Sequence, residues 1–131
     1  MSSFLLNILS PMGLAYEGEV ASMYAPSSAG PLGILPGHTP LIASINPKGG
    51  LLYIEDDNGK KMIFAVASGA IEVKKEKTIV LTERAESVSN EEAGKEALVR
   101  FGEYIKKEQN VNDDVRKAEA KLASAYSLDQ K

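Results

Sequence analysis

Apolar and polar residues alternate in short runs over the first part of the chain, up to about Ala85. Each run is rich in Leu, Ile, Val or Tyr and is closed by Gly, Pro, Asn or Asp, which is typical of β-strands joined by tight turns. The runs predict strands at Phe4–Leu9, Leu14–Gly18, Glu19–Ala25, Leu41–Ile45, Leu51–Ile54, Lys61–Val66, Gly69–Val73 and Thr78–Thr82. Because no helix-length segment separates them, the pattern predicts about eight to ten short strands in an antiparallel β-sandwich or flattened barrel.

One hairpin is predicted with particular clarity, where Asn58-Gly59 separates two of these runs. Asn and Gly both tolerate positive φ, which the tightest hairpin turns require. The acidic residues Glu55, Asp56 and Asp57 lie at the same tip, but their spacing is not that of a calcium-binding loop. The tip is therefore predicted to be a solvated turn and not a metal site.

The pattern changes at Glu86. From there to the end the chain contains no Pro, is rich in Ala, Glu and Lys, and spaces its apolar residues by three or four. Ser89 and Glu92 fit a capping box, in which each side chain caps a backbone N–H group near the other residue. A helix is predicted from about Asn90 to about Glu108, and a second from about Asp113 to about Tyr126.

The whole chain is therefore predicted to be mainly β with a C-terminal α-helical hairpin. Its two predicted domains are a β-sandwich over residues 1–86 and an αα-hairpin of two antiparallel helices over residues 87–131. The inner stripes of both helices are rich in alanine, which buries little apolar area. We expect such a hairpin to dock weakly on the β domain and to be able to come away from it.

Composition narrows the classes of function. The chain has 131 residues, of which 44% are hydrophobic and 25% are charged, values that are ordinary for a globular protein. A formal net charge of −3 provides no basic surface for nucleic acid. The absence of cysteine excludes disulfides, thiolate nucleophiles and cysteine metal sites. The apolar opening Phe4–Leu9 is far too short to span a bilayer, so we expect any membrane association to depend on partner proteins.

A corner at Gly30–Ile42 is the most constrained stretch of the sequence. It contains Gly at three positions and Pro at three, yet four of its residues are Leu or Ile, so its backbone is expected to follow a prescribed path against a core. His38, the one histidine of the chain, lies at its crest. A histidine in such a place is more often a hydrogen-bonded loop residue than a catalyst.

Two alternatives to a non-catalytic role follow from the residues alone. The first is a small hydrolase or isomerase in which His38 is the general base. Its nucleophile would have to be Ser22, Ser44 or Ser68, none of which lies in a G-x-S-x-G elbow. The second is a ligand-binding β-sandwich whose helices form a lid. No phosphate-binding G-x-x-x-x-G-K-(S/T) loop and no zinc-binding spacing is present.

The segment Gly33-Ile34-Leu35-Pro36-Gly37-His38-Thr39-Pro40-Leu41 closely resembles the signature G-I-(L/Y)-P-G-H-x-P-L of the epsilon subunits of bacterial F-type ATP synthases. The resemblance extends from about Phe4 to about Tyr126. It implies a flattened β-sandwich followed by a mobile helical arm, with no catalytic site and no required cofactor. It also implies a central-stalk (rotor) subunit that couples ion translocation through the c-ring to ATP synthesis. The implied location is the cytoplasmic face of the bacterial cell membrane, as a peripheral protein.

The resemblance further implies three partners. The gamma subunit and the c-ring bind the β domain, and the corner residues Gly30, Pro31, Leu32, Gly33 and His38 are the expected interface. The extended arm reaches the alpha/beta catalytic head and hinders ATP hydrolysis. Family members often carry Glu or another polar residue where this chain has Pro31, so no charge pairing is expected at that position.

ATP is a candidate regulatory ligand of the arm. Asp114-Val115-Arg116-Lys117-Ala118 is similar to the (I/L)-D-x-x-R-A motif with which some bacterial epsilon subunits bind ATP. This chain has Lys117 in place of the motif's Arg, and Lys lacks the planar fork that binds phosphate in a bidentate manner. Asp114 also favours the positive end of a helix dipole without any ligand. We therefore expect no specific ATP site, and Asp114 and Lys117 are the residues that would form one.

Overall fold

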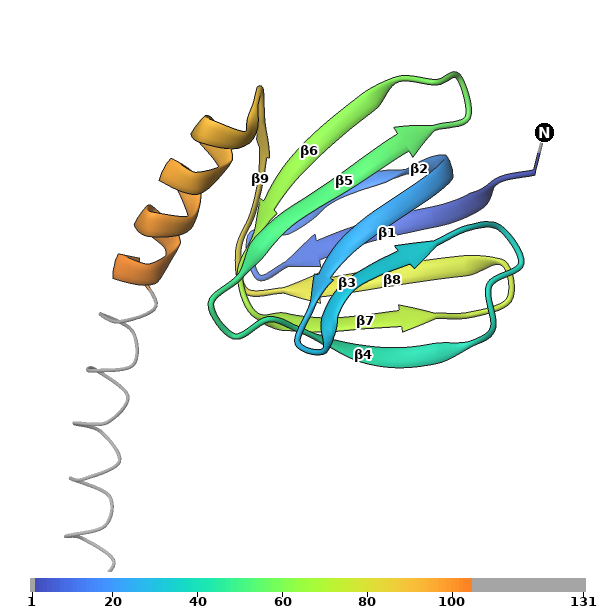
Figure 1. Ribbon diagram of the computed structural model, residues 1–131, viewed down its shortest axis with the longest axis horizontal. Helices are drawn as coiled ribbons and strands as arrows, with labels where there is room; N and C mark the ends of the chain where they lie inside the picture. The colour runs from blue at the N-terminus through green and yellow to red at the C-terminus, as the bar shows by residue number, and fades with distance from the viewer. Residues whose placement is uncertain (1, 105–131) are drawn as a thin grey trace, which may run out of the picture. The chain divides into compact units, whose positions relative to one another are not determined.

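The structure is a computed structural model that describes residues 2–104, so the predicted second helix and the end of the first lie outside the described residues (Figure 1). The described residues contain nine strands, which confirms the predicted β domain. The strands are β1 (Phe4–Ser10), β2 (Gly13–Ser27), β3 (Gly30–Ile34), β4 (Leu41–Ile45), β5 (Gly50–Asp56), β6 (Lys61–Val66), β7 (Gly69–Val73), β8 (Lys77–Thr82) and β9 (Ala85–Val88).

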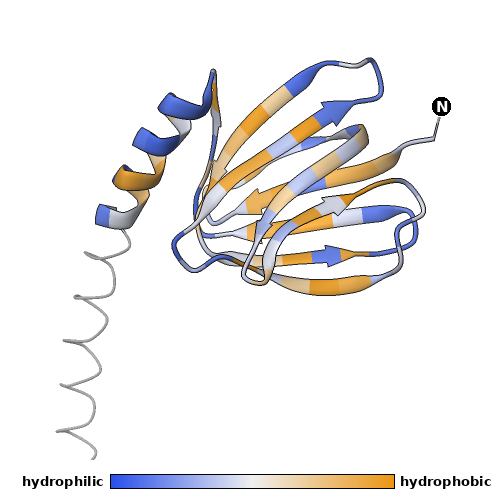
Figure 2. Cartoon of the chain, viewed as in Figure 1, coloured by the Kyte–Doolittle hydropathy of each residue, from blue (hydrophilic) through white to orange (hydrophobic). Residues whose placement is uncertain are grey.

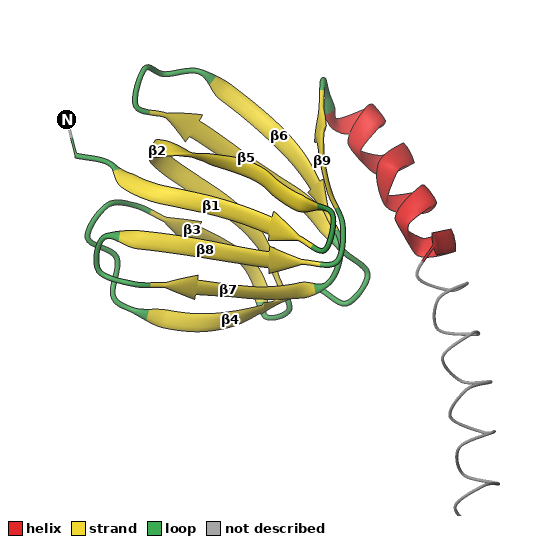
Figure 3. Ribbon diagram, turned by 180° about the vertical axis from the view of Figure 1, so that it is seen from behind, coloured by secondary structure: helices red, strands yellow, loops and turns green. Residues whose placement is uncertain are grey.

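The strands form one curved sheet that closes on itself. They follow the order β1-β8-β7-β4-β2-β5-β6-β9, with β3 paired to β2 and β1 also paired to β2. Figure 3 shows β8, β7 and β4 side by side in one layer, while β5 and β6 run through the other. All pairs are antiparallel except β1 and β8, which are parallel. The predicted antiparallel sandwich therefore contains one parallel pair that the sequence did not indicate, because turn signals report only on strands that are adjacent in the sequence.

Two predicted strands are in fact the single long strand β2. Gly18 was expected to end a strand, but it lies within β2 opposite Leu6. A side chain at Gly18 would meet the hydroxyl of Tyr16, so this glycine makes room for a neighbouring side chain and does not form a turn. The register of β2 against β5 shifts between Val20 and Ser22, where β2 passes from β1 to its later partners. Such a bulge bends the strand and so helps the sheet to close.

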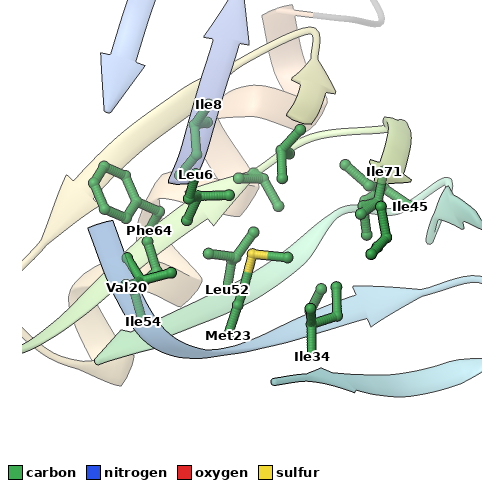
Figure 4. Close-up of a cluster of buried hydrophobic side chains, with 14 of the residues drawn as sticks. Leu6, Ile8, Val20, Met23, Ile34, Ile45, Leu52, Ile54, Phe64 and Ile71 are labelled. Atoms are coloured by element: carbon green, nitrogen blue, oxygen red, sulfur yellow. The ribbon is translucent and has the colours of Figure 1, made fainter. Parts of the chain in front are cut away.

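The core lies between the two layers and follows the alternation that the sequence predicts. Leu6, Ile8, Val20, Leu52 and Ile71 are completely buried, and Figure 4 shows their side chains pointing toward one another from different strands. Figure 2 shows β6 apolar along most of its length, which agrees with its sequence of one lysine followed by five apolar residues. Burial of these side chains is the main source of stability for the sandwich.

A helix begins at residue 91 and continues to residue 104, the last described residue. Its cap is Asn90 and not Ser89, because the backbone N–H of Ala93 donates to Asn90 Oδ1 over 2.8 Å. Asn is among the best N-cap residues, since its short side chain can accept from the first turn. The chain up to Phe101 forms one compact unit, and a second unit begins at Gly102. The predicted division of domains at residue 86 stays a prediction.

Candidate partner-binding site

The crest of the predicted corner is a type II β-turn. The His38 N–H donates to the Leu35 carbonyl oxygen over 3.1 Å, with Pro36 and Gly37 between them. Gly37 has a φ of 80°, and Pro at the second position with a positive-φ residue at the third is the signature of this turn type. The sequence therefore determines the shape of the corner locally.

Part of the corner is a strand, so the predicted interface residues alternate between the outer and the inner face of the sheet and differ in exposure. Gly30–Ile34 forms β3, paired with the second half of β2. Pro31 and Gly33 are exposed, whereas Leu32 is only partly exposed and packs against the core. His38 is half-buried, and its ring Nδ1 donates to the Thr39 carbonyl oxygen over 2.7 Å. Of the five residues, Pro31 and Gly33 are thus placed best to contact a partner.

A groove of about 540 Å³ runs across β3, β2, β5 and β6 next to the corner. Gly33, Tyr24, Tyr53 and Ile63 lie in one row across the four strands, each paired with the next. The Tyr24 ring lies 3.6 Å from where a side chain at Gly33 would begin, so it lies beside the exposed glycine. Leu35, which is 63% exposed, borders the groove from the corner. The apolar floor of the groove is therefore continuous with the corner.

The second row of the groove is polar. Ser22 pairs with Glu55, and Glu55 pairs with Lys61 on β6. Opposite charges directly across two strands attract one another. The groove thus offers an apolar floor beside a polar, charge-balanced border. No sequence pattern points to these residues as a group, because they come together only through strand pairing.

A second apolar surface covers the outer side of the other layer. Leu14, Leu9, Leu81 and Ala70 form a row across β2, β1, β8 and β7, each opposite the next. Leu14 is 52% exposed, Leu81 is 53% exposed, and Ile42 on β4 is 76% exposed. We call this surface, defined by Leu9, Leu14, Ile42, Ile79 and Leu81, the β1–β8 face. Leu14, Leu9 and Leu81 are contiguous, whereas Glu72 lies between Ile79 and Ile42. Exposed apolar surface of this kind marks sites of protein–protein contact.

A signal for the β1–β8 face was present in the sequence. Ile79, Val80 and Leu81 are three consecutive apolar residues, and consecutive residues of a strand point to opposite faces. Val80 is completely buried, which leaves Ile79 and Leu81 on the outer side. A run that is apolar on both faces therefore predicts a strand covered on both sides.

The sequence also raised the questions of a metal site, a membrane span and a nucleotide site. Among residues 2–104, no three His, Cys, Asp or Glu side chains come together as a metal site. No helix in that part of the chain is long and apolar enough to cross a membrane. Asp114 and Lys117, the candidate nucleotide-binding residues, lie outside the described residues.

A β-sandwich that presents two apolar surfaces defines a class of protein, namely a subunit that assembles with other proteins through its faces. Residues 3–88 match the family model described as "ATP synthase, Delta/Epsilon chain, beta-sandwich domain". The chain belongs to this family, whose epsilon chain is a non-catalytic subunit of the ATP synthase. This membership confirms the resemblance seen in the sequence and sets aside the hydrolase interpretation.

Bacterial relatives agree with this assignment. The chain is 31% identical over 128 residues to the ATP synthase epsilon chain of Alkalilimnicola ehrlichii, covering 97% of this chain and 90% of that protein. It is 37% identical over 105 residues to the ATP synthase epsilon chain of Dichelobacter nodosus, covering 79% of this chain and 72% of that protein.

Solved structures show the same fold. A chain of the Euglena gracilis mitochondrial ATP synthase, solved as an OSCP/F1/c-ring assembly, superposes with a TM-score of 0.62 at 21% identity. The match covers 70% of this chain and 59% of that chain. A chain of the Tetrahymena thermophila mitochondrial ATP synthase, described as central stalk and c-ring, gives a TM-score of 0.51 at 16% identity, covering 63% and 65%.

Proposed function

We propose that the protein is a central-stalk (rotor) subunit that couples ion translocation through the c-ring to ATP synthesis. In this role it catalyses no chemical reaction. Its β-sandwich is a rigid body that holds the gamma subunit and the c-ring in a fixed relation. The observation that carries the proposal is the β1–β8 face, an exposed apolar surface on a member of the epsilon family. The protein reaches the cytoplasmic face of the bacterial membrane through these partners.

The β1–β8 face is the proposed contact with the gamma subunit. Its most exposed side chains, Ile42 and Leu81, lie on strands of a closed sheet, so the backbone that presents them is already ordered before binding. Side chains that are rigid before binding contribute most to an interface, because little entropy is lost when they are buried. Gamma would cover this apolar surface and remove it from water.

The corner is the proposed contact with the c-ring. Pro31, Gly33 and Leu35 are exposed there, and the groove continues this surface toward Tyr24 and Tyr53. A ring loop with one apolar side chain and polar neighbours fits the apolar floor and the polar border of the groove. Pro31 contributes shape and no charge to this contact.

The C-terminal arm is the proposed regulator of ATP hydrolysis. Its predicted helices expose little apolar area to the β domain, so release of the arm toward the alpha/beta head would meet a small barrier. Regulation of this arm by ATP is not expected. Calorimetric titration of the chain with ATP should show no saturable binding with a Kd at or below about 1 mM. A Kd of this size corresponds to a binding free energy of roughly 4 kcal/mol. Saturable binding that is abolished by Asp114→Ala would contradict this expectation.

The assembly itself is tested with two variants on different surfaces. Leu81→Asp places a charge in the β1–β8 face at a position that is already 53% exposed, so the fold should survive. We expect this variant to lose binding to a gamma–c-ring complex, whereas Ser87→Asp, at an exposed position on β9, should bind as the original chain does. Undiminished binding of the Leu81→Asp variant would refute the proposed gamma contact.

The corner is tested separately. Leu35→Asp and His38→Asp should weaken attachment to the ring while leaving binding to isolated gamma unchanged. Leu35 is a sharper probe than Leu32, because Leu32 packs against the core and its replacement would also disturb the fold. If both variants bind the ring as the original chain does, the corner does not face the ring.

A further inference from the structure

The start of the helix has a close seat on β5. A methyl group at Gly94 would lie only 2.5 Å from Leu51 Cδ2, so any other residue at position 94 would require the Leu51 side chain to move from its place. One turn later, Leu98 lies 3.1 Å from where a side chain at Gly49 would begin. Leu51 of β5 therefore packs against a glycine of the helix, and Leu98 of the helix packs against the glycine that immediately precedes β5.

Two further helix residues, Ala97 and Phe101, are buried near this seat. Only Gly94, Ala97 and Phe101 are buried in the described part of the helix. Tyr53 Oη donates to Glu91 Oε1 over 2.8 Å, and an Arg100 nitrogen lies 3.1 Å from Glu86 Oε2, but both pairs are exposed. Exposed pairs of this kind contribute little to stability. The fit of Leu51 against Gly94 is thus a close apolar contact between the helix and the sheet that the exposed polar pairs do not replace.

We propose that the Leu51–Gly94 contact is a latch that holds the start of the helix on the sheet and sets how readily the arm is released. The regulatory meaning of the latch rests on the proposed function, whereas the contact itself does not. Glycine is a poor helix residue, so its presence in the first turn of this helix opposes helix formation. The close approach to Leu51 supplies a physical reason for glycine at this position, and the helix depends on docking for its stability.

Hydrogen exchange of the full chain, read by NMR, tests the latch. Gly94→Ala improves helix propensity but collides with Leu51, and overpacking of this kind should lower the protection of the Ala97 amide about tenfold. Gly102→Ala is the matched control, because it improves propensity in the same helix where nothing lies within 4 Å. The control should leave protection unchanged or raise it. The amides of Ile8 and Val80 in the core should not change in either variant.

A double variant gives the decisive comparison. Leu51→Ala alone removes the large side chain and should also lower Ala97 protection. Combined with Gly94→Ala, it creates a small side chain facing a small side chain, and protection should recover toward that of the original chain. Protection in Gly94→Ala that equals or exceeds that of the original chain would overturn the latch, as would the absence of recovery in the double variant.

A separate assay tests whether the Leu51–Gly94 contact affects regulation of ATP hydrolysis. In an assembled ATP synthase, Gly94→Ala should change the rate of ATP hydrolysis, whereas Gly102→Ala should not. If exchange changes as expected and hydrolysis does not, the latch stands and the proposed regulatory role of the arm fails. If exchange does not change, the latch fails whatever the hydrolysis assay shows.

Discussion

Two glycines with different surroundings show how single residues constrain this sheet. A side chain at Gly69 would overlap the backbone carbonyl of Leu81, and its φ of 153° is one that other residues rarely adopt. A side chain at Gly33 would meet only the Tyr24 ring at 3.6 Å, which is ordinary contact. Gly69→Ala should therefore destabilise the protein by about 2–4 kcal/mol, and Gly33→Ala by less than about 0.5 kcal/mol. Urea unfolding of both variants checks this, and equal effects would contradict it.

The hydrogen bond between Tyr53 and Glu91 can be followed by titration of the tyrosine. The hydrogen bond to Glu91, with partial burial and the negative charge of the carboxylate, raises the pKa of Tyr53 above 10.0. The bond therefore contributes to docking of the helix below pH 10, and this contribution is lost as the pH rises through the raised pKa of Tyr53. Glu91→Ala should lower the Tyr53 pKa toward 10.0 in an NMR titration. Glu92→Ala, which removes the neighbouring carboxylate, should leave the Tyr53 pKa as it is.

At the scale of the element, two neighbouring residues are candidates for the N-cap of the helix. The sequence fits a capping box at Ser89, whereas in the structure Asn90 accepts from the Ala93 N–H. Asn90→Ala should weaken the helix by about 1 kcal/mol, and Ser89→Ala should have little effect. Helix amide exchange in the two variants measures this difference. A larger effect of Ser89→Ala would restore the sequence-based assignment.

The strands show which element boundaries a sequence can specify. The hairpin around Gly59 forms where Asn58-Gly59 predicts it, and Asp56 Oδ1 accepts from the backbone N–H groups of Asn58 and Lys60. Gly59 has a positive φ, whereas no described residue other than glycine does. Asn58 therefore has a negative φ, although the predicted turn would have allowed a positive one. A turn is thus located by its residues, while its detailed form follows from the strands that it joins.

At the scale of the whole molecule, the compact unit ends after Phe101 and includes the start of the helix. A chain that ends after Phe101 should unfold at nearly the same temperature as the full chain. A chain that ends after Val88 lacks the buried Ala97 and Phe101 and uncovers Leu51, so it should be less stable by about 2–4 kcal/mol. Thermal unfolding of the two truncated chains checks this. Equal stability would favour the predicted division at residue 86.

The sequence by itself determined the local features of this protein. Alternation of apolar residues located most strands, and the pair Pro36-Gly37 specified the turn at the corner. The nine-residue signature around His38 indicated the family, which the comparisons confirmed. These features depend on residues that are close in the chain, so a short stretch of sequence is enough to specify them.

Only the tertiary structure decided the features that depend on strand pairing. The parallel pairing of β1 with β8 aligns Leu9 with Leu81 and so creates the β1–β8 face. The pairing of Tyr24 with Gly33 and Tyr53 creates the floor of the groove. The seat of Gly94 on Leu51 joins residues of a helix and a distant strand. The surfaces through which the protein acts are assembled from residues far apart in the sequence, because closure of the sheet, and not local preference, brings them together.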